Sequence, residues 1–254
     1  MNKKVELPIN TPKEATPTNP DWGWGLKMIL LTLGFLGLAF GSFYAFSYLI
    51  VKNISLEQEK EIFGDFMMMQ GEYQEFDKSI VNGYLDDFEY DLYLWEADQA
   101  NAFATLGANI AVSRGLLEEV EYLEELLFVI GHEKGHVVNQ DPLRMFTTQF
   151  PFMMALRYFG YDIGVDLTRI GNLMGNFVTK EMEIQADNKG IEFVKDKGLD
   201  PACALGFFDE ESGYYQKMQE FFSTHPMTST RIENIKKQIG IEEFDFQDCK
   251  DFPY

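Results

Sequence analysis

LLFVIGHEKGHVVNQDP, residues 126–142, is an apolar run into which two histidines and a glutamate are set. The run belongs to a Leu- and Glu-rich pattern over residues 116–139 that predicts a long helix, ended by Asp141-Pro142. Apolar residues on both sides of the polar ones indicate that this helix is buried. We therefore expect a helix that carries ionisable side chains into the interior of a domain.

The spacing of these ionisable residues is that of a metal site. His132 and His136 are four residues apart, so a helix presents both imidazoles on one face, where they can bind one ion. Glu133 follows the first histidine and can act as general base on water at that ion. The alternative is a neutral histidine pair in a core, which is unfavourable when a carboxylate is buried beside it without a cation. The pattern therefore predicts one Zn²⁺ per chain.

A third ligand must come from another segment, because catalytic zinc takes three protein ligands and keeps one position open. Residues 165–197 form a second helical pattern, which contains Glu181, Glu183 and Asp187. Glu181 and Glu183 point ~200° apart on a helix, so only one can face the metal, and the spacing favours Glu183. Asp187 shares the face of Glu183 and is placed to accept the free N–H of a ligating histidine. The alternative is a solvated acidic helix face.

The other segments predict an α+β fold, mainly α with a small β-sheet. Amphipathic spacing predicts helices over residues 55–76 and 228–239. Residues 88–95 alternate apolar and acidic side chains, and residues 108–113 are a short β-prone run, so we expect a strand in each.

One N-terminal stretch is long and apolar enough to cross a membrane. No charged residue occurs from Met28 to Val51, and ~20 apolar residues suffice to span the hydrocarbon core. A cleaved signal peptide has a shorter apolar region of ~7–15 residues, and a core helix without any polar face is rare. The sequence thus predicts a disordered tail (1–24), a transmembrane anchor (25–52) and a zinc-binding domain (53–254).

Charge indicates the partners and the orientation. The chain has 41 acidic and 21 basic residues, a net charge of −20, which argues against a nucleic-acid partner and leaves membrane attachment to the apolar helix. Lysines are more numerous before the anchor than after it, and such an excess marks the cytoplasmic side. Lys3, Lys4, Lys13 and Lys27 precede the uncharged stretch 28–51, and only Lys52 and Lys60 follow it closely. We expect a single-pass protein with a cytoplasmic N-terminus and an extracytoplasmic domain.

The two cysteines leave a choice open. Cys203 and Cys249 can pair in an oxidising compartment, which agrees with an extracytoplasmic domain. Two buried free thiols explain them equally well.

Several motifs between Asn101 and Ile235 together resemble one family. The motifs are Asn101-Ala-Phe103-Ala104, His132-Glu-Lys-Gly-His136, Glu183-Ile-Gln-Ala186-Asp187, and His225-Pro226 followed by Arg231-Ile232. With these motifs the chain resembles the gluzincin metallopeptidases, and within them the family of the CAAX prenyl endopeptidase, the heat-shock protease HtpX and a mitochondrial inner-membrane stress protease. The single anchor differs from the several membrane spans of HtpX, and is closer to members that work outside the cytoplasm.

The resemblance implies roles for individual residues. Zinc would be held by His132, His136 and Glu183, and Glu133 would be the catalytic base. His225 would stabilise the oxyanion or occupy the open zinc position at rest, with Arg231 holding it. Asn109, Ile110 and Ala111 would belong to an edge strand along which an extended substrate pairs.

These roles predict a membrane-anchored zinc endopeptidase with protein or peptide substrates, cleaving misfolded or membrane-proximal proteins in quality control. The alternative is a zinc-stabilised chaperone or binding module that keeps the fold without cutting, and the intact Glu133 argues against it. A third possibility is an anchored helical adaptor without metal. The oligomeric state stays open.

Overall fold

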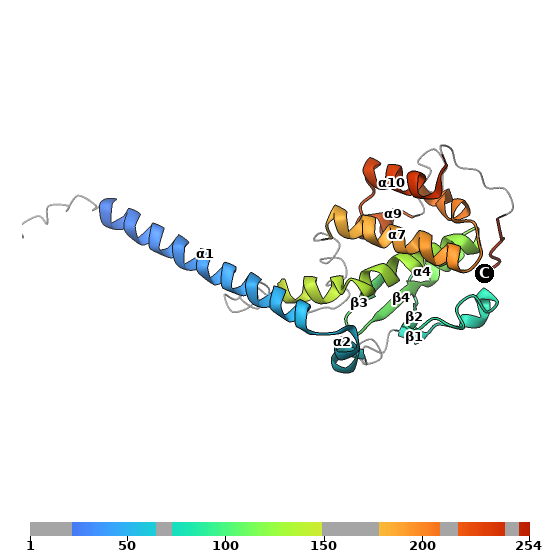
Figure 1. Cartoon of the computed structure of the whole chain (residues 1–254), viewed down its shortest axis with the longest axis horizontal. Coiled ribbons are helices and arrows are strands. Elements are labelled where there is room, and N and C mark those ends of the chain that lie inside the picture. The colour runs from blue at the N-terminus through green and yellow to red at the C-terminus, as the bar shows by residue number, and fades with distance from the viewer. Residues whose placement is uncertain (1–21, 65–72, 149–177, 209–217, 242–248) are drawn as a thin grey trace, which may run out of the picture. The chain divides into compact units, whose positions relative to one another are not determined.

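The computed structural model describes residues 22–64, 73–148, 178–208, 218–241 and 249–254 (Figure 1). The chain divides into two compact units, residues 1–43 and 44–254. Helices dominate the described residues and the sheet is small, so the expected α+β class is confirmed. The predicted disordered tail lies outside the described residues up to position 21.

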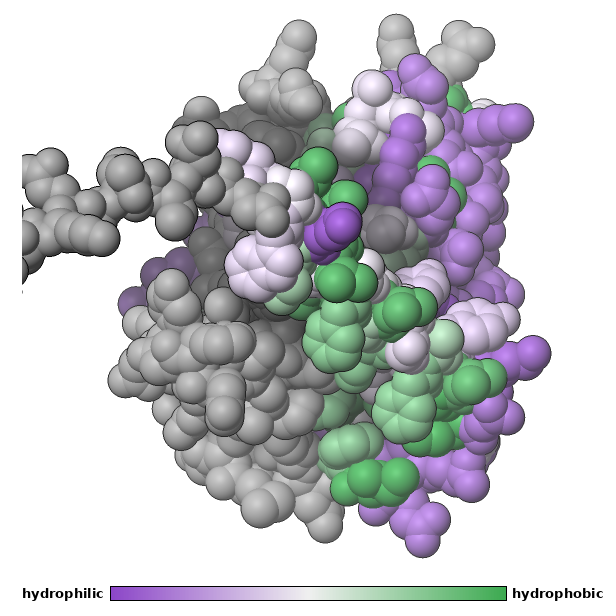
Figure 2. Space-filling model, turned by 90° about the vertical axis from the view of Figure 1, so that its left-hand side faces the viewer, coloured by the Kyte–Doolittle hydropathy of each residue, from purple (hydrophilic) through white to green (hydrophobic). Residues whose placement is uncertain are grey.

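Helix α1 (Trp22–Asn53) contains the apolar stretch and starts three residues before the predicted anchor. Among the described residues it is the one candidate for a membrane span, and no residue of its most apolar window is buried. Most of the large hydrophobic side chains that the described chain exposes belong to this helix. Figure 2 shows such side chains gathered in one zone, with hydrophilic ones over most of the remaining coloured surface. A helix this apolar and this exposed requires an apolar environment.

A four-stranded sheet, ordered β1-β2-β4-β3, forms one layer of the second unit. Its strands are β1 (Tyr73–Glu75), β2 (Asp91–Trp95), β3 (Ala102–Thr105) and β4 (Asn109–Ser113). β2 and β4 run parallel, and the two outer pairs are antiparallel. Because side chains alternate along a strand, Ile110 and Val112 enter the main core, while Ala111 lies with Tyr73 and Tyr93 on the opposite face.

The predicted edge strand is corrected by this topology. β4, which holds Asn109, Ile110 and Ala111, pairs with β2 on one side and with β3 on the other, so it is an internal strand. All three residues are fully buried. The strand at this edge of the described sheet is β3, because the turn at Gly107 folds it back against β4.

Two predicted helices were interrupted by long-range pairing. The pattern over 116–139 is divided into α3 (Arg114–Glu119) and α4 (Leu123–Val138), because Tyr122 between them pairs with Asp251 near the C-terminus. The helix predicted over 55–76 is wrong at its end, where residues 73–75 are strand β1, paired with β2. Its beginning is α2 (Leu56–Phe63), capped by Ser55.

Helix α4 packs closely on α7 (Lys180–Asp196), and small residues make this possible. A Cβ added at Gly131 would lie 2.7 Å from the Phe193 Cβ, and one at Gly135 would lie 2.7 Å from the Ala186 Cα. Gly131 and Gly135 each precede a histidine of the metal motif. The close crossing therefore brings the histidines of α4 against the acidic face of α7.

Two further elements, η4 (Pro201–Phe208) and α10 (Ser229–Ile239), pack against this pair of helices. The other described elements are η3 (Lys78–Val81) and α9 (Gln219–Thr224). The helix predicted over 228–239 is thus confirmed as α10.

A disulfide between Cys203 and Cys249 decides the choice that the sequence left open. Cys203 is buried in η4, and Cys249 begins the C-terminal segment 249–254. That segment lies against the start of α4, where Lys250 O accepts the N–H of Leu123 at 2.8 Å and the N–H of Phe252 donates to Glu121 O at 2.9 Å. The disulfide therefore ties residues 249–254 to η4, which packs against α4.

Replacing both cysteines by alanine is expected to lower the free energy of unfolding by about 2–4 kcal/mol, because the closed loop spans 46 residues and its closure restricts the unfolded chain. Denaturant titration of the full chain in detergent measures the loss. Reductant should destabilise the parent chain by a similar amount and leave the double variant unchanged. A parent chain that is insensitive to reductant would contradict the prediction.

Candidate metal centre

Helix α4 supplies the first three residues of the site. His132 and His136 present their Nε2 atoms 3.2 Å apart on one face of the helix, and Glu133 is buried next to them. Neither carboxylate oxygen of Glu133 has a hydrogen bond within the described part of the chain. A buried carboxylate without such a bond is unfavourable unless a ligand or water completes its surroundings.

Helix α7 brings the acidic residue that the sequence favoured. Glu183 is buried, with its Oε1 3.4 Å from His136 Nε2 and its Oε2 3.6 Å from His132 Nε2. Glu181 is exposed, as expected from its position on the other side of the helix. The structure therefore brings Glu183, and not Glu181, to the two histidines.

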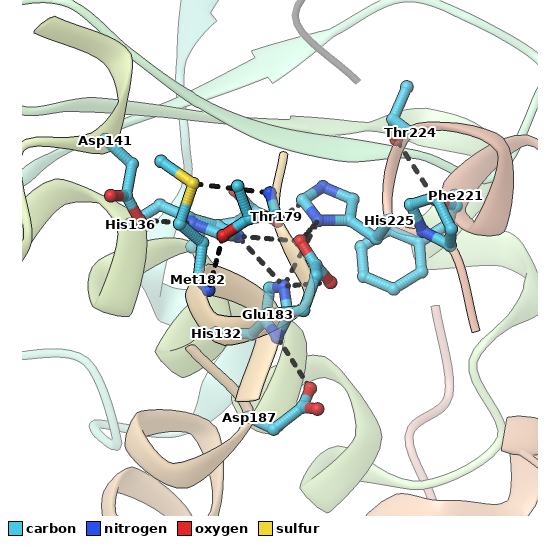
Figure 3. A network of polar contacts seen from close by, with 12 residues as sticks. His132, His136, Asp141, Thr179, Met182, Glu183, Asp187, Phe221, Thr224 and His225 are labelled. Atoms are coloured by element: carbon cyan, nitrogen blue, oxygen red, sulfur yellow. Dashed lines mark hydrogen bonds and ion pairs between the residues drawn. The ribbon is translucent and has the colours of Figure 1, made fainter. Parts of the chain in front are cut away.

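The third histidine of the chain completes the cluster. His225 follows α9, stacks on the Phe221 ring at 4.7 Å between centroids, and points its Nδ1 toward the other ligands (Figure 3). This Nδ1 lies 3.2 Å from His132 Nε2 and 3.1 Å from Glu183 Oε1. The other ring nitrogen, Nε2, lies 3.2 Å from Glu133 Oε1.

The geometry of these four residues fits a zinc ion. Ligand atoms of His132, His136, Glu183 and His225 all lie within 4.8 Å of one another, and all four residues are buried. Four ligands at ~2.0–2.1 Å from a tetrahedral zinc are ~3.3 Å apart, close to the separations of 3.1–3.6 Å quoted above. Three imidazoles and one carboxylate are also a set of ligands that zinc accepts.

Each histidine of α4 is oriented by a carboxylate on its other nitrogen. Asp187 Oδ1 lies 3.0 Å from His132 Nδ1, the partnership that the sequence predicted. Asp141 Oδ2 lies 2.9 Å from His136 Nδ1. The sequence reading missed this second role and took Asp141 as the end of the helix, although an acidic residue five positions after the second histidine was a usable signal. Both contacts fix the proton on Nδ1 and leave Nε2 free for a metal.

Arg231 is buried completely and links three parts of the site. Its Nε and Nη2 donate to the two oxygens of Asp187 at 2.8 and 2.6 Å, and its Nη1 lies 2.6 Å from Glu183 Oε2. Nη1 also donates to the backbone oxygens of His225 and Pro226, at 3.0 and 3.1 Å. The sequence had placed Arg231 beside His225; the structure extends its contacts to both acidic residues of α7.

Burial and charge act in opposite directions on the titratable groups. Burial is the largest effect on His132 and lowers its pKa, against the Asp187 contact. Burial also lowers the pKa of His136, but the hydrogen bond to Asp141 and the charges of Glu133 and Glu183 outweigh it and raise the pKa to about 10. For Glu183, burial raises the pKa, but the neighbouring imidazoles outweigh it and hold the pKa well below its ordinary value.

Zinc affinity is expected to rise with pH. With a pKa of about 10, the metal-free His136 is protonated at pH 6–8, and it must lose that proton to bind a metal. Affinity should therefore increase by up to about ten-fold per pH unit, whereas His132, with its lowered pKa, adds no such dependence. Competition with a chromophoric chelator at several pH values, corrected for the chelator's own titration, measures this. An affinity that does not change with pH would contradict the pKa of His136.

Comparisons with known proteins agree with this geometry. The model of the family described as peptidase family M48 matches residues 74–239. The β-barrel assembly-enhancing protease of Yersinia pestis is 26% identical over 169 residues, which cover 59% of this chain and 35% of that protein. The mitochondrial metalloendopeptidase OMA1 of Schizosaccharomyces pombe is 25% identical over 162 residues, 61% of this chain and 48% of that protein. For the protein of the same name in Arabidopsis thaliana the identity is 22% over 196 residues, 75% of this chain and 40% of that protein. The chain thus spans between a third and a half of the length of these relatives.

Proposed function

Since this chain belongs to peptidase family M48 and is a zinc metallopeptidase, we propose that it is a membrane-anchored endopeptidase that cleaves unfolded or membrane-proximal protein segments in quality control. The observation that carries the proposal is the buried cluster of four ligand atoms with the Glu133 carboxylate beside it. A binding module without activity would not need that carboxylate in the interior.

We assign the metal to His132 Nε2, His136 Nε2 and the carboxylate of Glu183. When bound there, zinc supplies a Lewis acid that polarises the scissile carbonyl and makes water a better nucleophile at neutral pH. Glu133 takes the proton of the attacking water on a carboxylate oxygen and passes it to the nitrogen of the leaving amine. Asp187 and Asp141 keep the two imidazoles oriented throughout, each through the Nδ1 proton.

His225 takes the fourth place in the ligand cluster, which in a catalytic zinc site belongs to water or substrate. The described arrangement is therefore a resting one in this proposal, and substrate entry requires His225 to leave. Its side chain then lies next to the reacting carbonyl, where an imidazole N–H can donate to the oxyanion.

Substrate binding is assigned to β3 (Ala102–Thr105), the edge strand of the sheet within the described residues, in place of β4. An extended peptide that adds to this edge is recognised mainly through its backbone, so cleavage should tolerate many side chains. This favours unfolded segments as substrates.

The domain is proposed to lie outside the cytoplasm. The excess of lysines before the anchor supports this orientation, and so does the Cys203–Cys249 disulfide, since disulfides persist in oxidising compartments.

Cleavage of an unfolded protein such as casein by the full chain in detergent tests the proposal. Cleavage should disappear with a zinc chelator and return when zinc is added back. Stoichiometric zinc without any cleavage would support the non-catalytic binding module, and a chain that binds no zinc would exclude the assigned site.

A further inference from the structure

The C-terminal end of α1 is joined to the helix that follows the metal motif. Ser47 is the one described residue of α1 that is buried, and its Oγ donates to the backbone oxygen of Thr147 at 2.7 Å. Thr147 lies in the helical residues 141–148, which come directly after α4 and its last turn. Both residues belong to the second compact unit, so the final turns of the apolar helix are part of the unit that contains the site.

A second junction lies even closer to the site. Gln140 precedes Asp141, the partner of His136, and its Nε2 donates to the Ile54 backbone oxygen at 3.1 Å and to Glu59 Oε2 at 3.0 Å. Gln140 is held in the left-handed region, with φ 52°, which few residues other than glycine adopt. The connection between α1 and α2 is thus hydrogen-bonded to a residue that directly precedes Asp141, the side chain that orients His136.

Helix α2 and Gly64, which follow this connection, also contact the turn between β3 and β4, next to the proposed substrate strand. Glu59 is buried, and its Oε1 accepts the N–H of Gly107, in the turn that connects β3 to β4, at 3.2 Å. Gly107 approaches α2 so closely that a Cβ there would lie 2.4 Å from the Phe63 backbone oxygen. Asn109 donates from Nδ2 to Gly64 O at 3.2 Å. We call residues 44–64, which make all these contacts, the collar.

The collar limits the distance between the site and the membrane surface. The uncharged stretch ends at Lys52, so the hydrocarbon boundary lies near that residue. Ile54 is two residues further on and is hydrogen-bonded to Gln140, which is four residues from His136. At no more than ~3.6 Å per residue, these short connections keep the metal ligands within ~25 Å of the level of Lys52.

We infer that the collar holds the active site at a fixed short height above the bilayer, so that the preferred substrates are extended segments adjoining a transmembrane helix on the same side of the membrane. This inference rests on the proposed function. A reach of ~25 Å corresponds to about eight residues of extended substrate, at ~3.3 Å per residue. Enzyme and substrate that share one bilayer meet at high effective concentration only when their reacting groups lie at the same height.

Two membrane-tethered reporters in proteoliposomes with the full chain test the inference. The near reporter carries an unstructured cleavable segment directly after its transmembrane helix, and the far reporter carries the same segment beyond a rigid helical spacer of ~40 residues, or ~60 Å. The near reporter should be cut at least ~10-fold faster. Random orientation lowers both rates equally, so the ratio of the rates is the readout. Equal rates would overturn the inference.

A linker variant tests whether the collar sets the height. Inserting ~40 Gly and Ser residues between Asn53 and Ile54 separates Ser47 from Thr147 and gives the domain an r.m.s. reach of ~35 Å, while the contacts of Glu59 and Gln140 stay intact. Cleavage of the far reporter should then rise and the ratio approach one. The matched control places the same insertion before Trp22 and should leave the ratio unchanged.

Casein cleavage in detergent by the same preparations distinguishes a failure of the collar inference from a failure of the endopeptidase assignment. Casein should be cut equally by the parent chain, the linker variant and the control. Intact casein cleavage with a ratio that the linker does not change would overturn the role of the collar alone. Loss of casein cleavage in the parent chain would instead overturn the endopeptidase assignment, and the inference with it.

Discussion

Glu133→Gln is expected to lower kcat/KM on unfolded protein by ~10²–10⁴-fold while zinc content stays that of the parent chain. The amide keeps the size of the carboxylate but cannot take the proton of the attacking water. Zinc binding survives because Glu133 is not one of the assigned ligands, and because its one ion-pair contact among the described residues, with His225 Nε2 at 3.2 Å, involves a residue that is not assigned to the metal either. Initial rates on casein, together with metal analysis, measure both quantities.

Lys134→Gln is the matched control. Lys134 is the next residue on α4, but its side chain points away from the metal cluster, toward Glu89. This variant should keep both activity and zinc. If Glu133→Gln retained more than about a tenth of the parent activity, another group would be the base and the assigned mechanism would be wrong.

Arg231→Met is expected to lower the free energy of unfolding by about 3–5 kcal/mol. The loss arises because Asp187 and Glu183 would remain buried as carboxylates without their cation. The His225 and Pro226 backbone oxygens would also lose their donor. Denaturant titration of the full chain in detergent measures the change, and reduced zinc affinity should accompany it, since Asp187 would no longer be held against His132.

Lys237→Met on the same helix removes an equal charge from an exposed position. It should change stability by less than about 0.5 kcal/mol. Arg231→Lys keeps the charge but loses the planar guanidinium that donates to both oxygens of Asp187. Its loss of unfolding free energy should therefore lie between those of Arg231→Met and Lys237→Met. If Arg231→Met were no less stable than Lys237→Met, the buried network would not support the site.

The collar was not found from the sequence. Ser47 is one of two serines in an apolar helix, and the pattern around Glu59 predicts a solvated residue of an amphipathic helix. Their burial depends on partners 100 and 48 residues away, Thr147 and Gly107. A pattern confined to one helix cannot reveal such partners.

The edge strand was misassigned for a similar reason. β-propensity identified residues 108–113 as a strand, and they are β4. Whether a strand is internal or at an edge depends on its neighbours, and β4 acquires one on each side. The neighbour β3 is only four residues long and was not predicted as a separate strand.

Local sequence features sufficed for the anchor, for the helix that carries His132, Glu133 and His136, and for the choice of Glu183 over Glu181. The anchor follows from the length of its uncharged stretch. The other two depend on residues within about one turn of helix, whose relative directions the backbone geometry fixes. The completed site depends on the folded chain, because His132 meets Asp187 across 55 residues and His225 across 93. Those contacts follow from the close crossing of α4 and α7 at Gly131 and Gly135 and from the anchoring of the His225 loop by Arg231. Packing of this kind is a property of several segments together, so no single segment encodes it.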